Sequence, residues 1–434
     1  MTDKKVLIIT YYWPPSGGSG VQRWLKFVKY LPQFGWTPYV CTPENPSFDI
    51  RDESLIKDIP TEAEVLKLPI WEPYDAFKRL SKFFTGKAKS SKPSDFISRQ
   101  DNSFFQKLST WIRANLFIPD PKVFWVRPTV KFLHDFIKDN NITTVITTGP
   151  PHSIHLIGKK LKHKNPALHW IVDFRDPWSE WGFLESIRTS RWAMSIHKKM
   201  ERNVLTQADS IIAVTPSWQK MLEHLSGKKV ELLTNGFDED DFKSITHVRT
   251  ANFVVRHVGV VNELCNPRPF MLALESLCST HQEFRNKVKV EFIGEADPSF
   301  RKFISERKDL EEVTVFVKSI SHEELLRQYG TASVLLLVVT GYKSPESYLP
   351  GKLFEYVASR LPVVGIGTTD GDAAFVLNDT QAGVMHDSND SEAIVNTLKK
   401  NFQDWRNPAE ERGKADISHY SRKVITGKLV ELLQ

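Results

Sequence analysis

Short apolar runs alternate with longer amphipathic stretches along the first half of the chain. The apolar runs are rich in β-branched residues and occupy residues 6–10, 38–42, 144–148, 170–174, 210–215 and 230–234. Runs of this length and composition predict strands of a parallel sheet that is covered on both faces. Helical periodicity lies between them, for example over residues 21–34, 153–161 and 217–225. The alternation predicts a doubly wound α/β domain.

The same alternation begins again in the second half. Apolar runs occupy residues 252–258, 288–293, 313–317, 333–339 and 362–366. A polar stretch without periodicity, residues 238–249, separates the two halves, and 434 residues suit two domains of ordinary size. We therefore predict two Rossmann-like domains, an N-terminal one at 1–240 and a C-terminal one at 250–415. By analogy with other two-lobed proteins, a last helix at about 420–434 is expected to pack back on the first domain.

The predicted first sheet is interrupted by a long segment, residues 75–127, in which we predict no strand. Nine basic and two acidic residues lie between Lys78 and Arg113, interleaved with aromatic side chains. This stretch carries +7 and the whole chain +6, so the remainder carries −1. Aromatic side chains insert at the level of lipid headgroups, and each cation attracts anionic lipids by about 1 kcal/mol. The segment therefore predicts contact with an anionic membrane surface. A solvated loop with its aromatics tucked into the first domain is the alternative.

Other features of the composition narrow the class of protein. Hydrophobic residues make up 41% and charged residues 25%, which is typical of globular domains. No apolar run approaches the length of a spanning helix, and the first apolar run is too short for a signal peptide. We therefore expect a cytoplasmic protein, peripheral at the inner face of a membrane. Cys41, Cys265 and Cys278 match no metal pattern, and no nucleic-acid recognition module is present.

Two loops follow predicted strands of the first half. Gly17 and Gly18 belong to a glycine-rich turn before a predicted helix, where backbone N–H groups can approach a phosphate or a sugar. A plain tight turn is the alternative. His152 lies in the sequence Thr-Gly-Pro-Pro-His-Ser between a strand and a helix, at the edge where α/β domains bind ligands. It is a candidate for proton transfer or for binding a hydroxyl, unless it is an ordinary loop histidine.

A third motif places two carboxylates at the end of a strand, in the sequence Asp173-Phe-Arg-Asp-Pro-Trp178. Side chains two residues apart on a strand project to the same side, so we expect the side chains of Asp173 and Arg175 to lie on the same face of the sheet. A buried Asp–Arg pair that only holds the loop is one interpretation. The other is that Asp176 or Asp173 acts as a base or stabilises positive charge on a sugar ring.

The fourth motif is Leu349-Pro-Gly-Lys-Leu-Phe-Glu-Tyr356. Lys352 and Glu355 are three residues apart on a predicted helix and therefore share a face. A lysine in the first helical turn opposes the helix dipole, which favours a bound phosphate there, and Gly351 leaves its N–H open to the same anion. Glu355, one turn further on, can accept hydrogen bonds from ribose hydroxyls. A solvated Lys–Glu pair is the alternative.

The order of these motifs resembles glycosyltransferase family 4, whose members are retaining enzymes of the GT-B fold, with two Rossmann-like domains facing a cleft. The matching segments are Gly17-Gly18, Asp173–Trp178, Thr234–Asp238, His257–Gly259, Lys352–Tyr356 and Ala382–Val384. The resemblance implies a donor site that includes Asn235, Gly236, Gly259, Gly351, Lys352 and Glu355. Val260 stands where the family often has an arginine, and Arg268 is the nearest cation.

The resemblance implies transfer of a sugar from a nucleotide-diphosphate sugar to a glycan acceptor, with retention. The basic aromatic segment suggests that the acceptor is lipid-linked, as in surface polysaccharide synthesis. Lys352 would meet the charge on the leaving diphosphate, so we expect neither a metal nor another cofactor. The first domain would hold the acceptor near Gly18, His152 and Asp176. The alternatives are a nucleotide-sugar epimerase or hydrolase of the same fold, and a non-catalytic sugar- or lipid-binding relative.

Overall fold

The computed structural model describes residues 4–46, 51–72, 104–180, 184–185, 187–243, 245–340, 344–408 and 415–434. The chain divides into two compact units, Met1–Thr234 with Thr426–Gln434, and Asn235–Ile425. Most of the basic aromatic segment predicted between Lys78 and Arg113 lies outside the described residues. None of the helices in the described ranges has both the length and the apolar character needed to cross a membrane.

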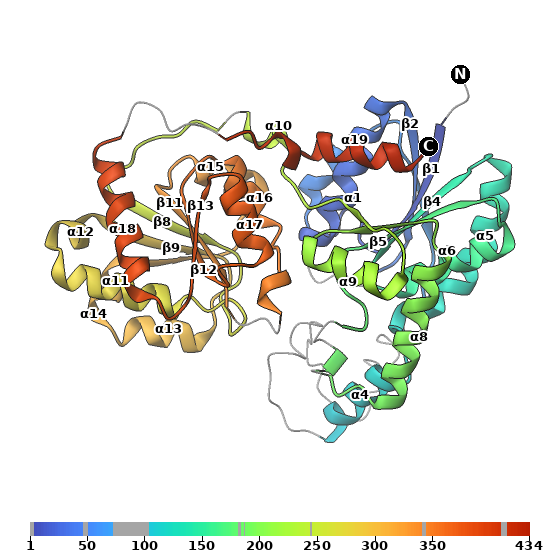
Figure 1. Ribbon diagram of the computed structural model, residues 1–434, viewed down its shortest axis with the longest axis horizontal. Coiled ribbons are helices and arrows are strands. Elements are labelled where there is room, and N and C mark those ends of the chain that lie inside the picture. Colours follow the sequence, from blue (N-terminus) through green and yellow to red (C-terminus); the bar gives the residue numbers. More distant parts are fainter. Residues whose placement is uncertain are drawn as a thin grey trace. The chain divides into compact units, whose positions relative to one another are not determined.

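The first unit is built on a parallel sheet of seven strands (Figure 1). In spatial order these are β3 (Glu64–Leu68), β2 (Trp36–Pro43), β1 (Lys4–Ile9), β4 (Thr144–Gly149), β5 (His169–Phe174), β6 (Ser210–Ala213) and β7 (Glu231–Leu232). The α-helices are α1 (Ser19–Tyr30), α4 (Phe104–Asn115), α5 (Val126–Asp139), α6 (Ser153–Lys164), α8 (Arg191–Gln207), α9 (Pro216–Ser226) and most of α19 (Arg422–Leu432). Short 3-10 helices are η1 (Leu31–Phe34), η2 (Glu53–Asp58) and η3 (Pro121–Trp125).

The strand order reverses at β1, which fixes where a ligand can bind. From β1 the chain adds β2 and β3 on one side and then crosses to form β4 on the other. Ile9 of β1 thus lies opposite Cys41 of β2 and Thr147 of β4. Connections leave β1 and β4 in opposite directions, which opens a crevice at the carboxyl ends of these two strands.

The second unit repeats this plan with six parallel strands. In spatial order they are β10 (Thr314–Val317), β9 (Val288–Ile293), β8 (Phe253–Val258), β11 (Val334–Val339), β12 (Val363–Gly367) and β13 (Gly383–His386). The α-helices are α10 (Glu239–Phe242), α11 (Arg268–Thr280), α12 (Gln282–Lys287), α13 (Pro298–Ser305), α14 (Lys308–Val313), α15 (His322–Tyr329), α16 (Lys352–Ala358), α17 (Asp372–Asp379) and α18 (Ser391–Arg406). Two 3-10 helices, η4 (Pro345–Ser347) and η5 (Ser418–Tyr420), complete it. The strand order here reverses between β8 and β11.

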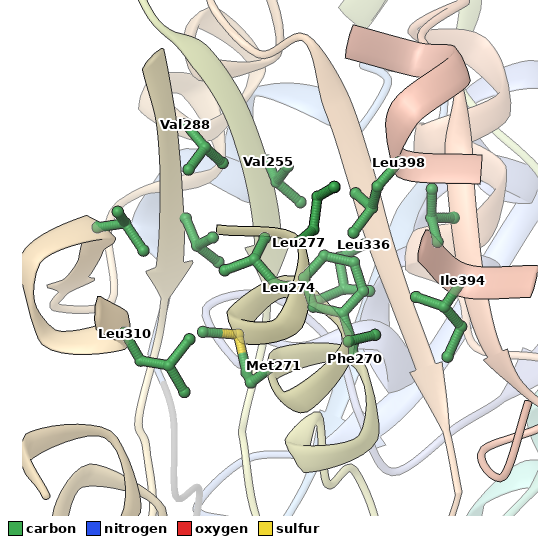
Figure 2. Packing of buried hydrophobic residues seen from close by; sticks show 14 of the residues in the cluster. Val255, Phe270, Met271, Leu274, Leu277, Val288, Leu310, Leu336, Ile394 and Leu398 are labelled. Atoms are coloured by element: carbon green, nitrogen blue, oxygen red, sulfur yellow. The ribbon is translucent and has the colours of Figure 1, made fainter. Parts of the chain in front are cut away.

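Apolar packing on one face of the second sheet explains why these segments form their elements. Figure 2 shows side chains of α11 and α18 converging on the strands. Leu274 and Leu277 of α11, three residues apart, lie on the face that packs against Val255 and Leu336. Strand β11 is buried along its whole length, as its unbroken apolar sequence requires in a sheet covered on both faces.

The structure confirms the predicted fold class of two parallel α/β domains. It also contains two edge strands that the sequence analysis missed, β3 and β13. Both lack the continuous apolar run that marks a central strand, because β3 contains the exposed residues Glu64 and Lys67 and β13 begins at Gly383. An edge strand has one neighbour and one open side, so its sequence need not be apolar throughout.

Candidate functional site

Three loops that the sequence analysis singled out meet at the carboxyl edge of the first sheet. They follow the adjacent strands β1, β4 and β5. The guanidinium of Arg175 donates hydrogen bonds to the carbonyl oxygens of Gly20, Gly149 and Pro150, so it joins all three loops. The predicted residues Gly17, Gly18, His152 and Asp176 all lie on these loops.

Asp173 is a fully buried structural carboxylate rather than an exposed catalytic one. Its oxygens accept hydrogen bonds from the Arg23 guanidinium (2.8 Å to Nη2), from Trp24 Nε1 (2.7 Å) and from the Thr148 hydroxyl (2.9 Å). Burial alone would raise the pKa of Asp173, but the charge and hydrogen bonds of Arg23 outweigh it and lower that pKa. The ion pair expected with Arg175 is therefore made with Arg23 of α1, and we remove Asp173 from the catalytic candidates.

Asp176 is the accessible carboxylate of this loop. Its side chain is partly exposed and makes no hydrogen bond or ion pair with any other residue in the described ranges. Burial raises the pKa of Asp176, and the neighbouring charge of Arg175 opposes that rise. A carboxylate with open acceptor positions and a nearby cation can stabilise a developing positive charge or accept a proton.

His152, on the loop after β4, packs against the loop that carries Asp176. Its ring stacks on Trp178 with 5.0 Å between ring centroids and 5° between planes. Burial, followed by the charge of His155, holds the pKa of His152 well below its usual range, so the ring is neutral at physiological pH. Its Nδ1 is buried without a hydrogen-bond partner in the described part of the chain. This nitrogen lies against Gly149, so a hydroxyl group would have to approach the partly exposed remainder of the neutral ring.

Two buried side chains that the sequence analysis missed hold the loop after β5 in place. Glu201 of α8 accepts hydrogen bonds from the backbone N–H groups of Trp178 and Ser179, at 3.2 Å each. His197, one helical turn earlier, accepts a hydrogen bond from Trp178 Nε1 at 3.0 Å. His197 and Glu201 are polar residues at positions that share the buried face of α8 with Val204 and Leu205, and this is the sequence signal that could have indicated their role.

The glycine-rich turn is set by backbone conformation. Gly18 has a φ of 92°, which favours glycine, and it precedes α1, whose start has no side-chain cap. A β-carbon built at Gly18 would meet no atom within 4 Å, so the space beside this residue is open. With no side-chain cap at the start of α1, an anion or a sugar that enters this space could accept hydrogen bonds from the first N–H groups of the helix.

The second unit brings Gly259 and Lys352 together at its own strand reversal. Gly259 follows β8 with a φ of 116°, and a β-carbon there would lie 3.4 Å from Lys352 Nζ. Lys352 Nζ donates a hydrogen bond to the Val258 carbonyl oxygen at 2.8 Å. Burial lowers the pKa of Lys352 to about 8. The protonated amine is thus poorly solvated, and an anion at this position would stabilise it.

Glu355 lies one turn further along α16, on the same helix face. It accepts a hydrogen bond from the Tyr329 hydroxyl at 2.8 Å, and its other oxygen lies 4.0 Å from His322 Nδ1. Burial raises the pKa of Glu355, while the charge of His322 opposes that rise. Tyr356 stiffens the same region because its hydroxyl accepts a hydrogen bond from the Val258 N–H at 2.9 Å.

The remaining predicted donor residues have other neighbours. Arg268 at the start of α11 donates to the Ser299 carbonyl and stacks over Phe303, with its guanidinium carbon 5.1 Å from the ring centroid. Asn235 begins the second unit. A β-carbon at Gly236 would overlap the Tyr420 carbonyl oxygen, which gives this glycine a packing role. Gly351 has helical φ and ψ angles and precedes α16.

Among the described residues, no three His, Cys, Asp or Glu side chains lie close enough together to hold a metal ion.

We predict opposite effects on stability for two neighbouring substitutions in one loop. Asp173→Asn removes the charge that Arg23 faces, and breaking a buried ion pair costs about 3–5 kcal/mol. Asp176→Asn replaces a carboxylate whose ionised form is disfavoured by burial, so the free energy of unfolding should stay the same or rise. Urea denaturation of both variants and wild type measures this. Equal destabilisation by the two substitutions would contradict the distinct roles assigned to these carboxylates.

Comparisons with known proteins agree on the fold. The sequence matches no model of a known protein family and no curated protein. Among solved structures, sucrose-phosphate synthase from Thermosynechococcus elongatus is 14% identical, with a TM-score of 0.56, over 99% of this chain and 94% of that one. The glycosyltransferase WaaG, involved in lipopolysaccharide biosynthesis, is 14% identical with a TM-score of 0.54, over 99% of each chain. A protein described as a UDP-N-acetylglucosamine 2-epimerase from Listeria monocytogenes is 10% identical with a TM-score of 0.53, over 99% of this chain and 95% of that one. At these identities the likeness establishes the architecture, two parallel α/β domains in series.

Proposed function

We propose that the protein is a glycosyltransferase of the retaining family 4 type, which transfers a sugar from a nucleotide-diphosphate sugar to a glycan acceptor. The observation that carries the proposal is the pair Lys352 and Glu355 at the strand reversal of the second unit, next to Gly259. That is where an open α/β sheet binds its ligand. The likeness to solved structures named as a sucrose-phosphate synthase and a glycosyltransferase supports it.

Each donor residue has a distinct task in this proposal. Gly259 lets a diphosphate approach the backbone, because a side chain there would compete for the space beside Lys352. The Lys352 ammonium contacts the phosphates. Glu355, already oriented by Tyr329, accepts hydrogen bonds from the ribose hydroxyls. Helix α16 spans only seven residues, so the charge of Lys352 rather than the helix dipole supplies most of the attraction.

Lys352 also provides the main catalytic effect. Negative charge builds up on the diphosphate as its bond to the sugar breaks, so a fixed cation stabilises the transition state more than the bound donor. The ammonium needs no reorganisation, because its hydrogen bond to Val258 already holds it beside Gly259. Under this proposal transfer needs no divalent metal.

The first unit holds the acceptor at the three loops joined by Arg175. The open space beside Gly18 admits a sugar, and the neutral ring of His152 binds a hydroxyl. Asp176 either accepts the proton of the attacking hydroxyl or stabilises positive charge on the donor sugar ring.

A nucleotide-sugar epimerase is the second candidate function, favoured by the likeness to the Listeria monocytogenes structure. It would use the same donor site and need no acceptor.

We further propose that the acceptor is lipid-linked and that the first unit binds an anionic membrane surface. The described residues next to the basic aromatic segment support this. Large apolar side chains are exposed there on successive segments: Trp71, Trp111, Leu116, Phe124 and Trp192. A hydrogen bond from the Ser190 N–H to Asn115 joins the end of α4 to the start of α8, and Trp71 packs edge-on against Phe124 at 4.8 Å between ring centroids. Exposed aromatics beside a basic segment are typical of a membrane interface.

Substitutions on α16 test the donor site. Lys352→Ala and Glu355→Ala should each weaken binding of a nucleoside diphosphate by about 1.5–3 kcal/mol, the cost of losing a charged hydrogen-bonding partner. The matched control is Lys302→Ala with Glu306→Ala, an exposed Lys–Glu pair at the C-terminal end of α13 in the same unit. Isothermal titration calorimetry with UDP, GDP, ADP and TDP, each with EDTA and again with Mg²⁺, measures the affinities. Unchanged affinity in both α16 variants would remove the donor-site assignment.

The pH dependence of the same titrations has a defined sign. The pKa of free Lys352 is about 8, so the amine is protonated below that pH and neutral above it. Nucleotide affinity should therefore fall as the pH rises through about 8, and Lys352→Arg should flatten this fall because an arginine keeps its charge. An affinity that does not change between pH 7 and 9.5 in wild type would show that Lys352 does not contact the phosphates.

The membrane proposal is tested by flotation with anionic vesicles. Wild type should bind strongly at low ionic strength and dissociate as salt shortens the Debye length from about 30 Å to 8 Å. Replacing Lys82, Lys87, Lys89 and Lys92, which lie outside the described residues, with glutamine should release the protein while nucleotide binding stays intact. Trp111→Ser with Trp192→Ser tests the aromatic contribution. Equal flotation of all variants would contradict a membrane role for this region.

A further inference from the structure

A basic pocket of about 660 Å³ lies between α5 and α6 of the first unit. The two helices pack against each other (Figure 1), and Gln207 at the end of α8 completes the lining. We call it the α5–α6 pocket. Its cations are Arg127, Lys131, Lys159, Lys160 and Lys164. Asp135 is the only carboxylate among its described lining residues.

The spacing of these residues explains why their side chains converge. Arg127, Lys131 and Asp135 are separated by four residues each along α5 and so share one helix face. On α6, Lys160 and Lys164 stand in the same relation, with Lys159 beside them. The buried faces of both helices pack on the first core, which leaves these two charged faces to meet at the surface.

No residue that the structure describes neutralises the cations of the pocket. None of the five makes an ion pair or a hydrogen bond with another residue of the described ranges. By contrast, Lys162 of α6 has partners: its Nζ lies 2.8 Å from Asp209 and donates a hydrogen bond to the Leu168 carbonyl. Burial, followed by the charge of Lys160, lowers the pKa of Lys159. The positive charges therefore oppose one another, and an anion between them would relieve this repulsion.

We propose that the α5–α6 pocket binds a phosphate-bearing anion at a site separate from the catalytic loops. Most of the lining side chains are exposed, so the pocket is an open depression that phosphate groups can reach from solvent. The excess of cations over the single carboxylate calls for a ligand with several negative charges, and arginine and lysine are the side chains that bind phosphate groups. Lys160 and Lys164 follow His152 by 8 and 12 residues, which is about 12–18 Å along α6. The proposal does not rest on the activity proposed above.

The phosphate groups could belong to a soluble phosphorylated compound or to a lipid headgroup, so two probes are needed. Sodium tripolyphosphate, titrated by calorimetry, represents the soluble source. Phosphatidylcholine vesicles with phosphatidic acid represent the lipid source. Both are measured with the pocket variant, in which Lys131, Lys159, Lys160 and Lys164 are replaced by glutamine. The control variant loses four exposed lysines of the same unit, Lys57, Lys67, Lys199 and Lys220. Both variants and the reference protein also carry Lys352→Ala, which removes tripolyphosphate binding in the second unit. All three carry glutamine at Lys82, Lys87, Lys89 and Lys92 as well, which removes the vesicle binding proposed for the basic aromatic segment.

The expected result is that affinity for at least one probe falls about tenfold or more in the pocket variant and stays near the reference in the control variant. If the pocket variant loses affinity for tripolyphosphate alone, the ligand is a soluble compound. If it loses affinity for vesicles alone, the ligand is a lipid headgroup. If it loses affinity for both, the pocket recognises the phosphate chemistry that the two probes share. Lysine acetylation followed by mass spectrometry, on the reference protein, should show that the bound probe protects Lys159 and Lys160 but not Lys199. Equal losses in the two variants, or no protection of these lysines, would overturn the proposal.

Discussion

The buried charge of Asp173 is the interaction on which the first unit's candidate site depends. A carboxylate taken out of water is costly unless charged and polar partners surround it, and Asp173 has the guanidinium of Arg23, the indole of Trp24 and the hydroxyl of Thr148. These partners come from α1 and β4, so satisfying one charge fixes that helix and strand against the end of β5. Arg175 then joins the three following loops through their carbonyl oxygens.

In this arrangement, some charged side chains stabilise the fold, and others keep free hydrogen-bonding positions for a substrate. Asp173 and Arg23 use up their bonding capacity inside the unit, whereas Asp176, two residues beyond β5, keeps open acceptor positions. The second unit shows a similar division at its own strand reversal. The Tyr356 hydroxyl accepts a hydrogen bond from the Val258 N–H at the end of β8. Lys352 and Glu355, on the same short helix, remain partly exposed and have few partners.

Much of the fold could be predicted from the sequence, because central parallel strands must be apolar along their length and such runs are visible directly. The face shared by Lys352 and Glu355 followed from helical spacing alone. Partners distant in sequence could not be found in this way. Arg23 and Asp173 are 150 residues apart, so the spacing rule suggested Arg175 in place of Arg23. The packing of Gly236 on Tyr420 and the support that Glu201 gives to Ser179 were equally hidden. The α5–α6 pocket depends on two helices that meet only in the folded chain.

The central claim is that this chain moves a sugar from a nucleotide diphosphate to a separate acceptor. Mass spectrometry of reactions with nucleotide sugars, with and without a mixture of free and lipid-linked glycans, tests it most directly. We expect nucleoside diphosphate to be released only when glycans are present, one glycan to gain the mass of a single sugar, and Lys352→Ala to abolish both changes. Isomerisation or hydrolysis of the nucleotide sugar at the same rate without any glycan would contradict it.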